Sequence, residues 1–424
     1  MNNVQKTQEL INAGGMDARL SRLYPDAVSA ARERYLHLTE LFYEQYGDGH
    51  DLRFFSAPGR TEVCGNHTDH NHGCVLAAAI NLDAVACAEK TDDGIIRIKS
   101  ENYSGDTVEL SVLTPQEKER EKSVSLVRGV AARFVQLGYK IGGLNAVTVN
   151  NVLKGSGMSS SASFEVLVGT LLNYLYNDGK ISPVEIAKIA QYAENEYFGK
   201  PCGLMDQMAC SVGGFVEIDF ADAKKPVITP VDFDFAACGH ALCIVDTRAD
   251  HADLTFEYAA IRQEMEAVAG FFGKTCLRET AESDVLDNMA ALREKLGERP
   301  ILRALHFYAE NRRVEQEAAA LKAGDFEAFK KLTVQSGYSS YMYNQNVFAS
   351  SAPQSQPVAL ALALSERILA GRGAWRVHGG GFAGTIQAFV PYDLLEEYRR
   401  QTEALFGAGS CYVLQIRPFG GTEV

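Results

Sequence analysis

Residues 59–73, "GRTEVCGNHTDHNHG", gather several side chains that could do chemistry. His67, Asp69, His70 and His72 fall within six consecutive positions. Imidazole nitrogens and carboxylate oxygens are common ligands of zinc. A loop dense in donors and acceptors also suits a sugar, because every hydroxyl both donates and accepts hydrogen bonds. The spacing H-T-D-H-N-H matches none of the common zinc patterns, yet residue chemistry alone leaves both interpretations open.

A second candidate site is the glycine- and serine-rich stretch "GSGMSSSAS", residues 155–163. It follows an expected strand, "NAVTVNNVL", and leads into an apolar segment, "FEVLVGTLLNYLY", expected to form a core helix. The first N–H groups of a helix lack intrahelical partners, and small residues let a phosphate approach them. No Gly-Lys-Ser/Thr follows the glycines, so this is not a Walker A loop. The pattern favours an anion site over a flexible linker.

Two carboxylates form the third candidate. Glu194 flanks the apolar stripe of the expected helix "SPVEIAKIAQYAENEYFG", and "PCGLMDQMACSVGG" places Asp206 among apolar neighbours. General bases are often carboxylates in apolar surroundings. The competing interpretation is structural, with one group in an ion pair and the other at a helix start. The residues alone favour that structural interpretation.

A glycine run, "VHGGGFAGT", lies between two expected strands near the C-terminus. Such a run allows either a close approach of the backbone to another group or a tight hairpin. A plain turn is the commoner explanation for a run of this kind.

The surrounding sequence predicts a globular protein of two domains. The chain has 424 residues, 46% hydrophobic and 22% charged, with a net charge of −13 that argues against a broad nucleic-acid surface. Nine scattered cysteines without a C-x-x-C pair, no apolar signal core and no membrane-length apolar run predict a cytoplasmic location. We place the boundary in the irregular stretch "ADAKKPVITPVDFDF", giving domains 1–229 and 230–424.

The elements that must position the candidate residues follow from periodicity and end signals. Residues 16–48 and 254–372 have helical patterns, whereas residues 53–100 contain short, partly alternating strands. Ser182, Pro183 and Glu185 fit the start of a helix, as cap, first residue and capping-box partner. "GGFVEIDF", "HALCIVDT" and "CYVLQIRP" are expected strands.

Taken together and in order, these motifs resemble those of the galactokinases and the wider GHMP kinase superfamily. "GRTEVCGNHTDHNHG" resembles the galactokinase signature, and "GSGMSSSAS" the superfamily phosphate loop. "PCGLMDQ" is similar to the segment around the galactokinase catalytic aspartate, and "GGGFAGT" to the third, C-terminal motif. The resemblance covers about residues 50 to 390. A single glycine motif is a weak signal, whereas four in order are a strong one.

The resemblance implies an α+β fold of two domains with the active site between them, and an ATP- and magnesium-dependent kinase acting on the anomeric hydroxyl of galactose. Asp206 takes the place of the base and Arg60 that of the arginine beside it. Residues in the places of sugar contacts are Asn66, His67, Asp69, Gly203 and Tyr258. Residues in the places of ATP-phosphate contacts are Gly155, Ser156, Gly157, Ser159, Ser160 and Ser161. Ser161, or its neighbour Ser160, and Glu194 take the places of the magnesium ligands.

The departures from the family pattern lie mainly in the sugar loop. The family's glutamate is Asn66 here, its tyrosine is His70, and a glycine is His72. Leu153 and Met158 are milder changes beside the phosphate loop. Two other functions therefore stay open: a sister 1-kinase for a uronic acid or an N-acetylhexosamine, and a non-catalytic, galactose-sensing relative. An intact Asp206, Arg60 and serine run argue against the second.

Overall fold

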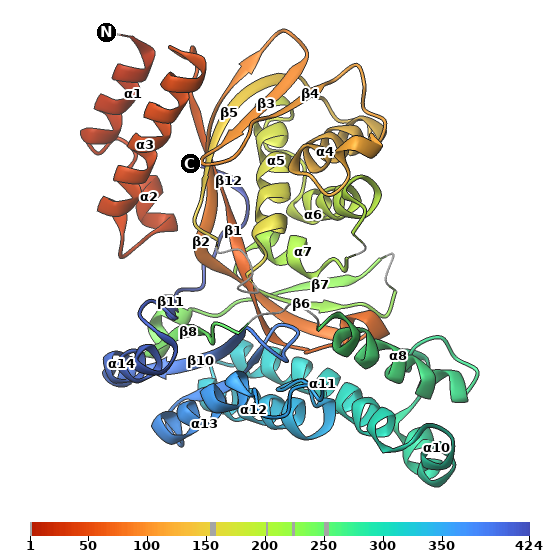
Figure 1. Ribbon diagram of the computed structural model, residues 1–424. Helices are drawn as coiled ribbons and strands as arrows, with labels where there is room; N and C mark the ends of the chain where they lie inside the picture. The colour runs from red at the N-terminus through yellow and green to blue at the C-terminus, as the bar shows by residue number, and fades with distance from the viewer. Residues whose placement is uncertain (1, 153–157, 201, 223–224, 250–253) are drawn as a thin grey trace.

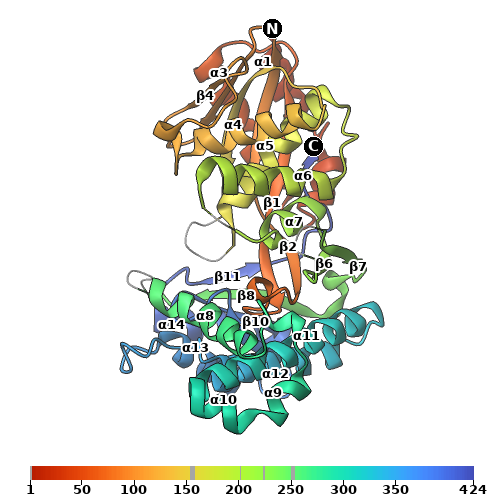
Figure 2. The same cartoon turned by 90° about the vertical axis from the view of Figure 1, so that its right-hand side faces the viewer.

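The computed structural model describes residues 2–152, 158–200, 202–222, 225–249 and 254–424. The molecule is elongated, with one mixed sheet and its helices at one end and a smaller sheet with most of the remaining helices at the other (Figures 1 and 2). Gly155, Ser156 and Gly157, predicted to bind phosphate, lie outside the described residues, as does Leu153. Helices and sheets occupy separate layers, and all strand pairs but β3–β5 are antiparallel among the described residues, as the α+β prediction requires.

The larger sheet is built on a long hairpin. Strands β1 (Arg53–Cys64) and β2 (Cys74–Thr91) pair antiparallel, and the strand order is β12-β1-β2-β5-β3-β4. Strand β6 pairs with the first residues of β2, Cys74–Ala78, and β7 pairs with β6. The other strands are β3 (Ile95–Ser100), β4 (Asp106–Glu109), β5 (Gly143–Asn150), β6 (Phe215–Asp219), β7 (Val227–Val231) and β12 (Thr422–Glu423).

Both faces of this sheet are covered, which explains why its two longest strands, β1 and β2, are buried along most of their length. Neighbouring residues of β1 point to opposite faces: Phe54 packs with the N-terminal helices, and Phe55 packs with α5 and its neighbours. The two helical layers lie on either side of the sheet in Figure 1. One layer is α1 (Asn3–Asn12), α2 (Asp17–Leu23) and α3 (Val28–Tyr46); the other contains α4 (Ser123–Gln136), α5 (Ser160–Tyr176), α6 (Pro183–Tyr192) and α7 (Met205–Val212).

The smaller sheet has the order β11-β8-β10-β9, all antiparallel. Its strands are β8 (His240–Asp246), β9 (Ala374–His378), β10 (Thr385–Pro391) and β11 (Cys411–Leu414). The glycine run joins β9 to β10, which confirms that it forms a hairpin. The helices at this end are α8 (Thr255–Phe271), α9 (Glu282–Asp287), α10 (Met289–Leu296), α11 (Glu298–Lys322), α12 (Phe326–Ser339), α13 (Pro357–Leu369) and α14 (Leu395–Phe406).

Two strands do not fit a simple division of the chain into two domains near residue 230. The stretch around residue 230, expected to be irregular, contains strand β7, which pairs with β6 along its whole length. Val227, Ile228, Thr229 and Val231 are β-branched and favour a strand, and Pro230, which has no N–H, is tolerated because β7 lies at an edge of the sheet. The C-terminal strand β12 returns to pair with β1 in the larger sheet. The division into 1–229 and 230–424 therefore stays a prediction, with residues 422–423 paired to the first part.

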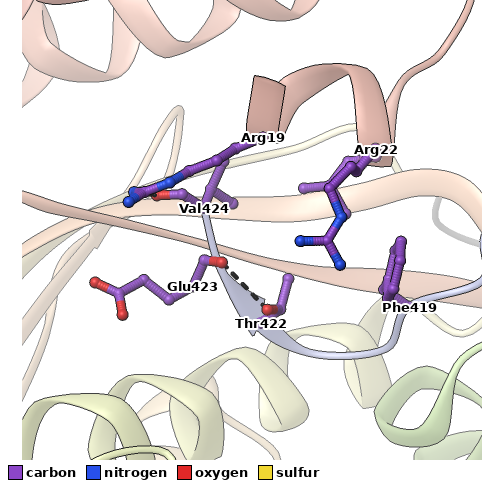
Figure 3. Close-up of a pocket in the computed structure, with 7 residues that line it drawn as sticks. Arg19, Arg22, Phe419, Thr422, Glu423 and Val424 are labelled. Atoms are coloured by element: carbon purple, nitrogen blue, oxygen red, sulfur yellow. Dashed lines mark hydrogen bonds between the residues drawn. The ribbon is translucent and has the colours of Figure 1, made fainter. Parts of the chain in front are cut away.

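A pocket near the C-terminus lies apart from all the predicted site residues. It is lined by Arg19 and Arg22 of α2 and by residues of the C-terminal segment (Figure 3). The Arg22 guanidinium stacks 4.7 Å from the centre of the Phe419 ring, and Arg19 Nη1 donates to the Val424 carbonyl at 3.0 Å. These contacts hold the end of the chain against α2. Within the described residues, no helix is both long enough and apolar enough to cross a bilayer.

Candidate active site

The structure brings Asp206 and Arg60 together although they are far apart in the chain. Asp206 lies in the first turn of α7, and Arg60 follows a shift in the β1–β2 register between Pro58 and Arg60. Such an irregularity turns a side chain away from its regular direction. Arg60 Nε and Nη2 approach Asp206 Oδ1 at 2.8 and 2.7 Å. The Arg60 side chain is 10% exposed and the Asp206 side chain is 34% exposed, so the arginine is the more buried partner.

Electrostatics keep this arginine charged. Burial by itself lowers the pKa of Arg60, but the neighbouring Asp206 carboxylate outweighs burial and raises it above its ordinary value. The result is a fixed positive charge beside Asp206. A developing negative charge beside Asp206 would be stabilised by this guanidinium.

The start of α5 closes the other side of Asp206. Ser159, the N-cap residue, has a left-handed backbone (φ 57°), and its hydroxyl donates to Asp206 Oδ2. Arg60 N donates to the Met158 carbonyl at 3.2 Å, which ties β1 to this turn. Ser160 and Ser161 follow in the first helical turn, Ser161 exposed. The predicted base and the described half of the predicted phosphate loop therefore meet.

The sugar loop connects β1 to β2 through a short 3-10 turn, η1 (Asp69–Asn71). Burial raises the pKa of the Asp69 carboxyl; His67 opposes this rise, and Asp206 adds to it. Gly203 lies against the same carboxylate, since a Cβ placed on it would be 3.1 Å from Asp69 Oδ2. Asp69 and Gly203 are thus neighbours of each other and lie within electrostatic reach of Asp206, as a shared substrate site requires.

His67 and Tyr258 both bind the third glycine motif. His67 Nε2 donates to the Gly380 carbonyl at 2.8 Å, and burial lowers the pKa of this imidazole, which leaves it neutral with Nδ1 as an acceptor. Tyr258, in the first turn of α8, donates its hydroxyl to the Gly381 carbonyl at 2.9 Å. A side chain at Gly380 would collide with the Tyr258 ring, at 2.5 Å from Cε1. The glycine run is therefore a close backbone approach as well as a hairpin.

Asn66 is placed differently from the other predicted sugar contacts. Its side chain is fully buried. Nδ2 donates to Glu62 Oε1 at 2.9 Å and to the Gly379 carbonyl at 2.6 Å, while Oδ1 accepts from Asn346 Nδ2 at 2.6 Å. Ser340 Oγ also donates to Oδ1, at 3.5 Å, so direct contact with a sugar would require this amide to leave its protein partners.

The other histidines of the loop have local surroundings that do not converge on one point. His70 Nδ1 accepts from Asn71 Nδ2 at 3.0 Å, and burial lowers the pKa of His70 to about 3. His72 ends the 3-10 turn in the left-handed region (φ 61°). In the part of the chain that the structure describes, no group of three or more histidine, cysteine or acidic side chains is arranged to hold a metal ion.

Glu194 lies in a different kind of helix from the one expected. The sequence predicts one regular helix from Ser182 onward; α6 ends at Tyr192, and residues 193–198 form the π-helical turn η3. Ser182 caps α6 as predicted, accepting from Glu185 N at 3.2 Å. The wider π turn carries Glu194, which is 4% exposed, and π turns often occur at functional sites.

A second buried carboxylate lies beside Glu194. Gln207 Nε2 donates to Glu194 Oε2 at 2.7 Å and to Glu165 Oε2 at 3.1 Å, and Lys200 Nζ is 3.4 Å from Glu194 Oε1. Burial and the neighbouring Glu194 raise the pKa of Glu165 well above its ordinary value. Glu165 Oε1 is buried without a hydrogen-bond partner among the described residues. The raised pKa favours the protonated, neutral form of Glu165, so Glu194 lies beside a second, uncharged carboxyl group.

Sequence reasoning missed a buried polar network behind the sugar loop. Arg376 Nη2 donates to Glu62 Oε1 at 3.1 Å, and Glu310 Oε1 accepts from Gly65 N at 3.2 Å. His306 Nε2 donates to the Asn66 carbonyl at 2.9 Å. Glu62 and Gly65 lie within the sugar-loop motif, whereas Arg376 of β9 and His306 and Glu310 of α11 lie in no recognisable motif, so no sequence signal could have identified these three.

Two family descriptions match this chain. Residues 40–90 match the galactokinase galactose-binding signature, and residues 125–214 match the N-terminal domain of the GHMP kinases. Galactokinase of Streptomyces coelicolor is 33% identical over 374 residues, covering 87% of this chain and 92% of that protein. Galactokinase of Actinobacillus pleuropneumoniae serotype 3 is 32% identical over 365 residues, covering 85% of this chain and 91% of the relative.

Solved structures give the same result at the level of the fold. Lactococcus lactis galactokinase, solved with galactose, superimposes with a TM-score of 0.76 at 25% identity, covering 92% of this chain and 100% of that one. Methanococcus jannaschii mevalonate kinase superimposes with a TM-score of 0.62 at 14% identity, covering 86% of this chain and 98% of the other, and shares the fold alone. The predicted GHMP kinase fold is confirmed.

Proposed function

This chain belongs to the galactokinases, within the GHMP kinases, and on that premise we propose that Asp206 is the base with which it phosphorylates galactose at the anomeric hydroxyl. The chain is an ATP-dependent sugar kinase, and galactose is the sugar that its relatives support. The observation that carries the assignment of the base is the contact of Asp206 with both Arg60 and the hydroxyl of Ser159.

The mechanism follows from where these groups lie. An ionised Asp206 would accept the proton of the anomeric hydroxyl, and Arg60 would hold the carboxylate in place and stabilise charge on the attacking oxygen. Ser159 links this centre to the start of α5, where the helix N-terminus favours a phosphate. Phosphoryl transfer depends mainly on alignment and charge neutralisation, and this arrangement supplies both.

Magnesium is expected at the side of the phosphates, and the residues present fit it. The hydroxyl of Ser161, or of Ser160, and the carboxylate of Glu194 are oxygen donors of the kind that magnesium prefers. The adjacent Glu165, with a buried oxygen that has no hydrogen-bond partner among the described residues, offers a further oxygen beside Glu194. When bound with ATP, the ion would neutralise charge on the phosphates.

The sugar contacts are proposed from the same geometry. Asp69 and Gly203 lie side by side next to Asp206, and His67 and Tyr258 present the third glycine motif to the same region. A uronic acid or an N-acetylhexosamine remains the second candidate substrate, because the sugar loop departs from the family at Asn66, His70 and His72.

A panel of free sugars tests the proposal directly. ADP release would be followed with galactose, galacturonate, N-acetylgalactosamine and glucose at equal concentrations. We expect galactose to give the highest kcat/KM. Higher kcat/KM for galacturonate would assign the chain to a sister kinase, and the absence of turnover with every sugar would leave a sensing role.

Removal of metal tests the magnesium assignment. EDTA should abolish activity, and added Mg²⁺ should restore it. Elemental analysis of the untreated protein checks the histidine loop in parallel: about one tightly held zinc ion per chain, lost on mutation of His70 and His72, would restore the zinc interpretation.

A further inference from the structure

The amide of Asn66 fits its surroundings in a way that no carboxylate could. Its Nδ2 group has two hydrogens and meets two acceptors, Glu62 Oε1 and the Gly379 carbonyl. Its Oδ1 meets a donor, the Asn346 amide, at 2.6 Å. An ionised aspartate or glutamate accepts hydrogen bonds only, so it would leave both acceptors without a donor and place a second negative charge beside Glu62.

Asn346 completes a second link to the glycine run. Its Nδ2 group donates to the Gly380 carbonyl at 3.1 Å as well as to Asn66, and its own carbonyl accepts from Phe382 N at 2.5 Å. A Cβ at Gly381 would lie 2.0 Å from the Asn346 carbonyl oxygen. The two asparagines therefore bind successive parts of the turn between β9 and β10.

The backbone of the sugar loop is held on the same side. His306 donates to the Asn66 carbonyl at 2.9 Å, and Ser339 lies 2.9 Å from the other ring nitrogen of His306. Burial lowers the pKa of His306 to about 4, so the ring is neutral and Nδ1 accepts from the Ser339 hydroxyl. Glu310 Oε1 accepts from Asn66 N at 3.4 Å. Position 66 is thus fixed through both its backbone and its side chain.

These bonds converge on the glycines that also bind the proposed sugar contacts. Asn66 binds Gly379 and Asn346 binds Gly380, whereas His67 binds Gly380 and Tyr258 binds Gly381. A shift of the glycine run would therefore move His67 and Tyr258 together. We propose that the side chains of Asn66 and Asn346 form an amide clasp that positions the third glycine motif. The clasp sets the affinity for the sugar without touching the sugar, an inference that rests on the proposed function.

The clasp predicts a specific pattern in hydrogen exchange. Asn66→Asp keeps the shape of the side chain but removes both N–H donors, and Asn346→Ala removes only the second link. We expect faster amide exchange in a peptide covering residues 376–386 for both variants, with the larger change for Asn66→Asp. Asn173→Asp is the matched control: Asn173 is also buried, and its amide bonds only the backbone of Ile181. The control should lower Tm without changing exchange in that peptide.

Kinetics give the second readout. Asn66→Asp should raise KM for galactose about 10-fold, as expected for buried hydrogen bonds lost from a positioning contact, and should change KM for ATP little. The effects of Asn66→Asp and Asn346→Ala on kcat/KM should not multiply in the double variant, because both break one clasp.

The outcomes separate this inference from the proposed function. Unchanged exchange at residues 376–386 in both variants would overturn the clasp, whichever sugar the wild type phosphorylates. Fully multiplicative kinetic effects would also overturn it. A wild type that phosphorylates no sugar would refute the proposed function alone, because the exchange measurement needs no substrate. If Asn66→Asp does not fold, Asn346→Ala still decides, since it leaves the Asn66 donors in place.

Discussion

Asp83 and Asp206 both bind arginine, and they differ in what else surrounds them. Asp83, on β2, is fully buried and binds Arg34 at 2.5 Å, Arg417 at 2.9 Å, Tyr24 at 2.5 Å and the hydroxyl of Ser56. Asp206 binds Arg60 and the Ser159 hydroxyl and keeps about a third of its side chain exposed.

The difference distinguishes a group that holds the fold from one that can react. Burial alone raises the pKa of Asp83, but Arg34 and Arg417 outweigh it and lower that pKa below its ordinary value. Asp83 joins α3, β2 and the C-terminal segment, and its oxygens have no room for a substrate. Asp206 has one face held by the protein and one face open. A carboxylate surrounded on all sides stabilises, whereas one held on a single side can exchange a proton.

Removing the reactive carboxylate should have the largest effect. Asp206→Asn keeps the size of the side chain but removes the base, so we expect kcat to fall by roughly 10²–10⁴-fold. Because Asp206 is about a third exposed, the midpoint of urea unfolding should fall less than it does for loss of the fully buried Asp83. Steady-state kinetics with galactose and ATP measure the first effect. Near-normal turnover would exclude Asp206 as the base.

Removing the structural carboxylate should give the opposite result. Asp83→Asn leaves Arg34 and Arg417 buried without a counter-charge, so the free energy of unfolding should fall by about 3–5 kcal/mol. Turnover per folded molecule should stay near that of wild type. Urea unfolding followed by circular dichroism, with activity measured at low temperature, checks both parts. A loss of turnover without a loss of stability would erase the distinction between the two aspartates.

A third carboxyl group, that of the buried Glu317, should show a pH dependence of stability opposite to that of Asp83. Glu317 is fully buried, and burial raises its pKa well above the ordinary value despite the opposing Arg376. A raised carboxyl pKa disfavours the folded state increasingly as pH rises above the ordinary range near 4. Glu317→Gln should therefore stabilise the protein at pH 8, because it removes a carboxyl group that burial holds in the protonated form. The gain should be smaller at pH 5.

Asp83 should respond in the opposite sense. Its lowered pKa contributes stability that is complete above the ordinary aspartate range, near pH 4, and is lost as pH falls through the lowered value. Tm measured from pH 3 to pH 8 in wild type, Asp83→Asn and Glu317→Gln distinguishes the two slopes. A constant gain for Glu317→Gln across this range would contradict a raised pKa.

The smallest expected effect concerns the second contact of Asp206. Ser159→Ala removes one hydroxyl from the carboxylate but leaves Arg60 in place. We expect kcat to fall about 5-fold, the equivalent of one hydrogen bond worth about 1 kcal/mol. Ser163→Ala is the control. It removes another hydroxyl of α5, one that donates to the Ala57 carbonyl of β1, and it should leave kcat unchanged.

Local patterns made much of the fold predictable. The cap at Ser182, the apolar helix after the serine run and the hairpin around the glycine run follow from bonds between near neighbours in the chain. The local sequence predicts an irregular stretch at residues 227–231, which is wrong because their strand character depends on pairing with β6. The π turn at residues 193–198 likewise depends on packing that periodicity does not report.

The family, the order of the motifs and the identity of the residues proposed for chemistry can be read from the chain alone, because they depend on residue type and spacing. Which groups meet depends on the folded structure: Arg60 binds Asp206 across 146 positions, and Asn66 binds Asn346 across 280. It also decided burial, and burial separates the open Asp206 from the enclosed Asp83 and turns Asn66 inward. Burial and long-range contacts depend on how distant segments pack, which no local pattern of residues specifies.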